Sequence, residues 1–237
     1  ENQIFDNADL ITIVSDSWKT DLESIGANNV EVVPLGYDTT DFSENIKLDT
    51  KFTLTHLGLL GEDRNPTILI EVIANLCKQD EDFSKYFRLQ LVGKVNEKLK
   101  SLVKELSLSE QVSFIGQVNR DEALEIMQTS QLLLLLLNKA ENVGGRIPGK
   151  VFEYLGARRP VLSLGPNNTD IEKMLKESGA GENIDYSDIA ELKTYLQNHL
   201  NLFLNQGINS TSNSVKKFTH KEVSATFAKH LETITKK

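Results

Sequence analysis

The chain has 237 residues, of which 39% are hydrophobic, enough for one large domain or for one domain plus part of another. Its formal net charge of −8 argues against a nucleic-acid partner, because such binding relies on clustered Lys and Arg. The single cysteine, Cys77, excludes an internal disulfide and a thiolate metal site and is compatible with the cytoplasm. No apolar run approaches the roughly 20 residues of a membrane span.

Short apolar runs alternate with longer segments of helical period along most of the sequence, a pattern typical of βα units that build a parallel sheet. Most of these runs are apolar throughout, so we expect strands covered by helices on both faces. The predicted strands are Leu10–Val14, Val30–Val33, Phe52–Leu57, Phe87–Val92, Val112–Ile115, Leu132–Leu137 and Pro160–Leu164.

The clearest helical stripe lies in Pro66–Lys78, with Asn65 expected as the N-cap and Pro66 as the first helical residue. Thr219 and Glu222 form a capping box, which predicts the start of the last helix. Its apolar stripe, Val223, Phe227, Leu231 and Ile234, is expected to pack across the sheet or back onto the N-terminal unit. The other predicted helices are Ser17–Ile25, Glu97–Leu106, Arg120–Thr129, Pro148–Ala157, Thr169–Lys176 and Asp188–Leu204.

The order of the predicted strands and helices divides the chain into three segments. Residues 1–49 contain one βαβ piece, too small to bury a sheet, and are interpreted as the tail of a preceding domain with an interdomain segment. Residues 50–206 form the main Rossmann-like domain, and residues 207–237 a polar linker and the last helix. Because the first residue is Glu1 and not Met, we expect a fragment.

The turn after the strand at 52–57 is the first candidate site. Gly58 and Gly61 let backbone approach a ligand, the following helix offers free N–H groups, and Arg64 adds a cation, so the turn is predicted to bind an anion. Its spacing matches neither the dinucleotide fingerprint nor a P-loop. The alternative is a plain βα turn in which Arg64 pairs with Glu62 or Asp63.

A second glycine loop, with Gly144 and Gly145, runs into the helix predicted to begin at Pro148. Lys150 and Glu153 share one face of that helix. A lysine opposes the helix dipole in the first turn, which is better explained if an anion binds there, and the carboxylate suits a vicinal diol such as ribose. The alternative is an exposed Lys–Glu pair.

Two weaker signals receive no site assignment. The acidic cluster Asp80–Asp82 is placed in a solvated helix-to-strand connection, although it has the composition of a metal-binding triplet. The four histidines, His56, His199, His220 and His230, show no ligand spacing and are given no role.

Several motifs together make the chain resemble the C-terminal half of a family-4 glycosyltransferase of GT-B architecture, in which two Rossmann-like domains face each other. The strongest match is Pro148-x-Lys150-x-x-Glu153-Tyr154-Leu155, continued by 160–162. The other matching segments are 8–15, 32–38 with Phe42, and 115–118 with 122–124.

The resemblance implies that Arg64 and Lys150 bind the donor diphosphate and carry most of this half's catalytic contribution, and that Glu153 binds the ribose. It places Gly116 and Val118 in the loop that contacts the base. The chain departs from the family at two positions: Leu59 stands where an arginine is common, and Gly145 where a second glutamate is common. Glu141 or Asn142 can substitute for that carboxylate.

The favoured function is transfer of a sugar from a nucleotide-diphosphate sugar to an acceptor, with retention and without a metal, as the resemblance implies. The acceptor is a sugar, a lipid-linked molecule or another group, and peripheral membrane contact is compatible with it. The missing N-terminal domain would supply the acceptor site, so this chain alone is expected to be inactive. The alternatives are a nucleotide-sugar epimerase of similar shape and a non-catalytic nucleotide-binding module.

Overall fold

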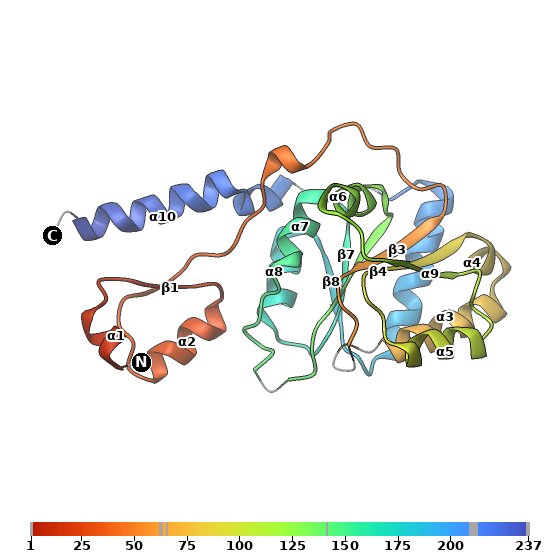
Figure 1. The fold of residues 1–237 in the computed structure, drawn as a ribbon, viewed down its shortest axis with the longest axis horizontal. Coiled ribbons are helices and arrows are strands. Elements are labelled where there is room, and N and C mark those ends of the chain that lie inside the picture. Colours follow the sequence, from red (N-terminus) through yellow and green to blue (C-terminus); the bar gives the residue numbers. More distant parts are fainter. Residues whose placement is uncertain (1, 62–63, 65, 141, 209–212, 236–237) are drawn as a thin grey trace.

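The computed structural model describes residues 2–61, 64, 66–140, 142–208 and 213–235. A small N-terminal unit lies beside a larger α/β body (Figure 1). The unit holds two parallel strands, β1 (Ile11–Ile13) and β2 (Val30–Val32), with helices α1 (Asn2–Asn7) and α2 (Asp16–Ser24). An extended segment with the short 3₁₀ helix η1 (Thr39–Asp41) leads from this unit into the body.

A parallel six-stranded sheet, counted over the described residues, forms the centre of the body in the order β5-β4-β3-β6-β7-β8. Relative to the first strand of the body, this is the Rossmann order 3-2-1-4-5-6, which confirms the predicted fold class. The strands are β3 (Phe52–Leu57), β4 (Phe87–Val92), β5 (Val112–Gly116), β6 (Leu132–Leu136), β7 (Val161–Leu164) and β8 (Gly181–Ile184).

Helices cover both faces of the sheet (Figure 1). Leu132, Leu134 and Leu136 pack into the core on one face, and Leu133, Leu135 and Leu137 into the core on the other. Alternate residues of a strand point to opposite faces, which explains why β6 is apolar throughout. On the first face lie α3 (Thr67–Gln79), α4 (Glu81–Tyr86), α5 (Glu97–Glu105) and α9 (Ile189–Asn205); on the second lie α6 (Arg120–Thr129), α7 (Lys150–Ala157) and α8 (Asp170–Ser178).

Among the α-helices and strands of the described residues, α1, α4 and β8 were not predicted. The acidic cluster at 80–82, placed in a connection by the sequence analysis, in fact begins α4. Asp80 is its N-cap and accepts from the Phe83 N–H at 3.0 Å. Strand β8 was missed because Glu182 and Asn183 interrupt any apolar run, although the strand pairs in register with β7.

Two helix starts differ from the prediction. Helix α3 begins at Thr67, and Pro66 occupies the N-cap position without a side-chain hydrogen bond; the predicted cap, Asn65, lies outside the described residues. Helix α7 begins at Lys150 rather than at Pro148, after a tight turn in which the Val151 N–H donates to the Pro148 carbonyl. Lys150 is therefore the first residue of its helix.

The last helix, α10 (His220–Thr235), forms as predicted, and Thr219 Oγ accepts from the Glu222 N–H at 3.4 Å. The predicted packing of its stripe is not seen. Among the described residues of α10 none is buried, and Phe227 and Leu231 are 40% and 45% exposed. The helix extends away from the sheet, preceded by the 3₁₀ helix η3 (Asn213–Phe218), part of which lies in the predicted linker (Figure 1).

Strands β3 and β6 pair over only two positions, Leu54 with Leu132 and Thr55 with Leu133, where their ladder stops. The Tyr154 hydroxyl of α7 accepts from the Leu57 N–H at 3.0 Å and donates to the Leu134 carbonyl at 3.3 Å. One buried hydroxyl therefore satisfies backbone groups of both strands where the ladder between them stops.

We expect Tyr154→Phe to lower the free energy of unfolding by about 1–3 kcal/mol, because the Leu57 N–H stays buried and loses its acceptor. Urea denaturation followed by circular dichroism measures this change. The control is Tyr195→Phe, since the Tyr195 hydroxyl has no hydrogen bond among the described residues; it should change stability by less than about 0.5 kcal/mol. Equal effects of the two variants would contradict the bridging role.

Candidate functional site

The strand order places a ligand crevice between β3 and β6. The chain leaves β3 for α3 on one face and leaves β6 for α7 on the other, so the connections diverge at the carboxyl ends of these two neighbours. In open α/β sheets this switch point is where ligands bind. Both glycine loops singled out in the sequence start here.

Three glycines meet at the carboxyl ends of β3, β4 and β5. The Gly58 N–H donates to Val92 O at 2.8 Å, and the Gly93 N–H donates to Gly116 O at 2.6 Å. All three have positive φ, and a Cβ on Gly93 would lie 2.4 Å from Gly58 O. The loops therefore approach more closely than side chains would allow. Gly93 was not predicted, although it follows its strand as Gly58 follows β3.

Arg64 stands on the turn between β3 and α3, and its N–H donates to Gly61 O at 3.4 Å. Its guanidinium Nε donates to Oδ1 of Asn138, which follows the end of β6. This contact brings the predicted cation to the β3–β6 switch point. The alternative pairing with Glu62 or Asp63 involves positions outside the described residues.

Lys150 and Glu153 form the ion pair that the sequence analysis weighed as an alternative, with Nζ and Oε2 at 3.0 Å. A second cation, Arg120 of α6, was missed in the sequence; its Nη1 lies 3.2 Å from Glu153 Oε1. The same guanidinium contacts Asp41 of the interdomain segment, and this hydrogen bond, followed by the charge of Asp41, raises the pKa of Arg120. Glu153 is therefore held between two cations, both of which a bound diphosphate would attract.

His56, which the sequence analysis gave no role, lies on β3 below the glycine turn and is 4% exposed. Its Nδ1 lies 3.0 Å from Leu134 O, and since a carbonyl only accepts, Nδ1 carries the hydrogen. Nε2 has no hydrogen-bond partner in the described part of the chain. The pKa of His56 is lowered to about 4, mainly by burial and with smaller contributions from the charges of Arg64 and Lys150, although the hydrogen bond to Leu134 O acts in the opposite direction. The imidazole is neutral at physiological pH.

The remaining predicted residues lie on the flanks of this region. Gly144 and Gly145 contact the first turn of α8 and the N-terminal unit: Gly144 O accepts from the Asp170 N–H at 2.9 Å, and Gly145 O from Ser15 Oγ at 2.6 Å. Val118, two residues beyond β5, packs partly buried against the core of the α6–α7 face. Asn142 is exposed, and Glu141 lies outside the described residues.

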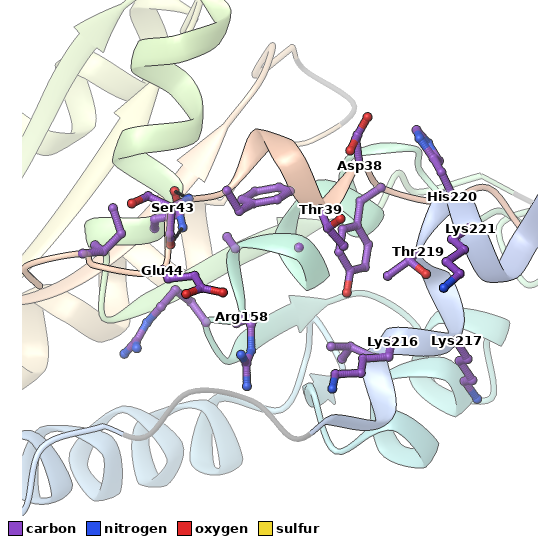
Figure 2. A pocket seen from close by; sticks show the side chains of 18 of the residues that line it. Asp38, Thr39, Ser43, Glu44, Arg158, Lys216, Lys217, Thr219, His220 and Lys221 are labelled. Atoms are coloured by element: carbon purple, nitrogen blue, oxygen red, sulfur yellow. Dashed lines mark hydrogen bonds between the residues drawn. The ribbon is translucent and has the colours of Figure 1, made fainter.

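Two cavities differ in their relation to these residues. One of about 310 Å³ opens beside Arg64, between the first turn of α3 and the end of β6. The larger one, about 1190 Å³, lies past the other end of α7 and contains none of the predicted site residues (Figure 2). The interdomain segment, Arg158 and the lysines of η3 and α10 line it. We place the candidate site at the switch point, because the glycine turns after β3, β4 and β5 lie there and both Arg64 and Lys150 are near enough to His56 of β3 to lower its pKa.

Within the described residues, no three His, Cys, Asp or Glu side chains gather as a metal site. The same part of the chain contains no helix with both the length and the apolar character needed to cross a membrane.

Residues 38–201 match the family described as glycosyl transferases group 1. The chain belongs to this family. The match covers the interdomain segment and nearly the whole body, including both glycine loops and α7. A comparison with curated protein sequences found no match.

Solved structures of glycosyltransferases share the fold. HepE from Anabaena in complex with UDP and glucose has a TM-score of 0.72 at 16% identity, with 98% of this chain and 65% of HepE covered. Sucrose-phosphate synthase from Thermosynechococcus elongatus has a TM-score of 0.71 at 13% identity, with 98% and 60% covered. The pneumococcal O-GlcNAc transferase GtfA, in complex with UDP and GlcNAc, has a TM-score of 0.71 at 14% identity, with 99% and 47% covered. This chain therefore spans less than two thirds of each relative, and its fold is that of the C-terminal half of a GT-B glycosyltransferase.

The neutral His56 predicts a pH-dependent stability. Its unfolded form takes up a proton as the pH falls below about 6.5, whereas the folded form resists protonation down to about pH 4. Stability is therefore complete above pH 6.5 and declines towards pH 4. Between pH 7 and pH 4.5 we expect wild type to lose about 2–3 kcal/mol more than His56→Gln, measured by urea denaturation. The control His230→Gln, on α10, should follow wild type; a His56→Gln curve parallel to wild type would contradict the assignment.

Proposed function

We propose that the chain is the donor-binding half of a retaining family-4 glycosyltransferase that takes its sugar from a nucleotide-diphosphate sugar. The observation that carries this proposal is that Arg64 and Lys150, each beside a glycine loop and a helix N-terminus, both act electrostatically on His56 at the switch point. The relatives crystallised with UDP support the choice of ligand by analogy.

In this proposal the chemistry of the donor half is electrostatic. The bond between the sugar and the diphosphate breaks, and negative charge grows on the leaving diphosphate. Arg64, Lys150 and the N-termini of α3 and α7 stabilise that charge, so the proposal requires no metal ion. Glu153 turns from its cations to accept hydrogen bonds from the ribose hydroxyls, and the Gly116–Val118 loop contacts the base.

The acceptor and the closure of the cleft belong to the other half of the full-length protein, because this chain spans less than two thirds of its structural relatives. We therefore propose that this chain alone binds a nucleoside diphosphate weakly and transfers no sugar. The acceptor class, sugar or lipid-linked, and a cytoplasmic location are parts of the same proposal.

Two other functions remain as alternatives: a nucleotide-sugar epimerase and a non-catalytic nucleotide-binding module. Turnover of a radiolabelled nucleotide sugar by the full-length protein separates them. Label moving to an acceptor identifies a transferase, label staying on an altered nucleotide sugar identifies an epimerase, and binding without turnover identifies the module.

The ligand assignment is tested with Arg64→Ala and Lys150→Ala. Each removes one charge-assisted contact worth about 1.5–3 kcal/mol, so each should weaken the binding of a nucleoside diphosphate by roughly ten- to a hundredfold. Calorimetry with UDP, dTDP, GDP and ADP measures this. Lys100→Ala is the matched control, since Lys100 pairs with Glu97 at the same i, i+3 spacing on α5. Unchanged affinity in both site variants would refute the assignment.

The role of Glu153 is tested by removing hydroxyls from the ligand. Glu153→Ala should weaken the binding of the ribonucleoside diphosphate by about tenfold and leave that of its 2′,3′-dideoxy analogue nearly unchanged. Glu97→Ala, which also removes the acid of an i, i+3 pair, should affect neither ligand. Equal losses for both ligands would show that the carboxylate acts only by orienting Lys150 and Arg120.

A further inference from the structure

The N-terminal unit contacts the second glycine loop through the first turn of α2. Ser15, the N-cap of α2, is 2% exposed; its hydroxyl accepts from the Trp18 N–H at 3.4 Å and donates to the carbonyl of Gly145 at 2.6 Å. Residues of two structural units thus share one buried hydroxyl. The contact joins the helix start of one unit to the loop that leads to Lys150.

A second set of contacts fixes the same turn to the first turn of α8. The carboxylate of Asp170 accepts from the Ser17 N–H at 2.9 Å and from the Ser17 hydroxyl at 3.0 Å, so an α8 side chain caps α2. Asp16 pairs with Lys173 at 2.7 Å. In Figure 1, α2 lies on the side of the N-terminal unit that faces α8.

Trp18 covers the backbone of Gly145. A Cβ on Gly145 would lie 2.4 Å from Trp18 Cδ1 and 2.8 Å from Nε1, so the indole occupies the space that any side chain would need. A Cβ on the neighbouring Gly144 would meet no atom within 4 Å. The requirement for glycine is therefore specific to position 145 and arises from the N-terminal unit.

We infer that Trp18 is a positioning residue of the donor site: seated on Gly145, it holds the loop at 143–149 and thereby Lys150 in place for the diphosphate. The inference rests on the proposed function. Gly145 is five residues before Lys150, and Ser15, Trp18 and Asp170 constrain the start of that connection on three sides. The donor site is consequently completed by a residue of the unit that precedes the body.

Trp18 is the one tryptophan of the sequence, so its fluorescence reports the contact directly. In Gly145→Ala the new methyl group displaces the indole, and we expect red-shifted emission and stronger quenching by acrylamide. Gly144→Ala is the matched control and should leave both unchanged, because its methyl group enters open space. Unchanged emission and quenching in Gly145→Ala would overturn the docking of Trp18 on Gly145.

The positioning role is tested by nucleotide binding to the 237-residue chain, using the tightest binder among UDP, dTDP, GDP and ADP. Gly145→Ala should weaken binding by about tenfold. In a Trp18→Ala background, adding Gly145→Ala should weaken nucleotide binding by less than about twofold, because the ring that clashes with the new methyl group is gone. Equal costs in both backgrounds, or wild-type affinity in Gly145→Ala, would overturn the inference.

Failure of the proposed function looks different. If wild type binds none of the four nucleotides while the emission responds as expected, the docking contact stands and the donor assignment is refuted, together with the role of Trp18 in it.

Discussion

The structure depends on how the backbone groups of β3 and β6 find hydrogen-bond partners beyond the end of the ladder between these strands. Their ladder ends after two residue pairs, and the backbone groups beyond it would be buried without partners. The Tyr154 hydroxyl takes the Leu57 N–H and reaches Leu134 O, and His56 donates to the same carbonyl. Two side chains thus replace the missing backbone hydrogen bonds between these strands.

The same arrangement concentrates positive charge on an acidic protein. Arg64 is anchored at the end of β6 through Asn138, and Lys150 opens α7 from the opposite face of the sheet. Because burial lowers the pKa of His56, the ring is neutral and does not repel the two cations near it. The two cations and the helix starts therefore make this edge of the sheet locally positive, although the net charge of the chain is −8.

The sequence predicted those helices and strands that are defined by the pattern of their own residues. Strands β3 and β4 and helix α6 have the predicted bounds, because apolar runs and caps define them without reference to the rest of the chain. Strand β8 was missed because its order comes from pairing with β7 rather than from its composition. At the site, the sequence proposed Arg64, Lys150 and Glu153 from their glycine turns and helix starts and from the family resemblance, and their roles as ligand-binding residues stay a prediction.

The site partners that the sequence analysis missed share a physical cause. Asn138 and Arg120 meet Arg64 and Glu153 across 74 and 33 residues of chain, respectively. Only the strand order brings such pairs together. Gly93 is the exception, because a glycine directly after an apolar strand was visible and could have been found. The packing of the α10 stripe stays a prediction: no described residue of α10 is buried, and amphipathic period shows which face of a helix is apolar but not what covers it.

The continuous leucine run of β6 also bears on how the chain folds. From Leu132 to Leu137 every side chain is buried in the native sheet, yet the strand must wait for β3, about eighty residues earlier, and for β7, which is made later. Until both neighbours are in place, six consecutive apolar residues without charge or proline are open to pairing with another chain. The segment at the centre of the finished sheet is thus the one that most needs shielding during synthesis, and recovery of the refolded protein should fall as its concentration rises.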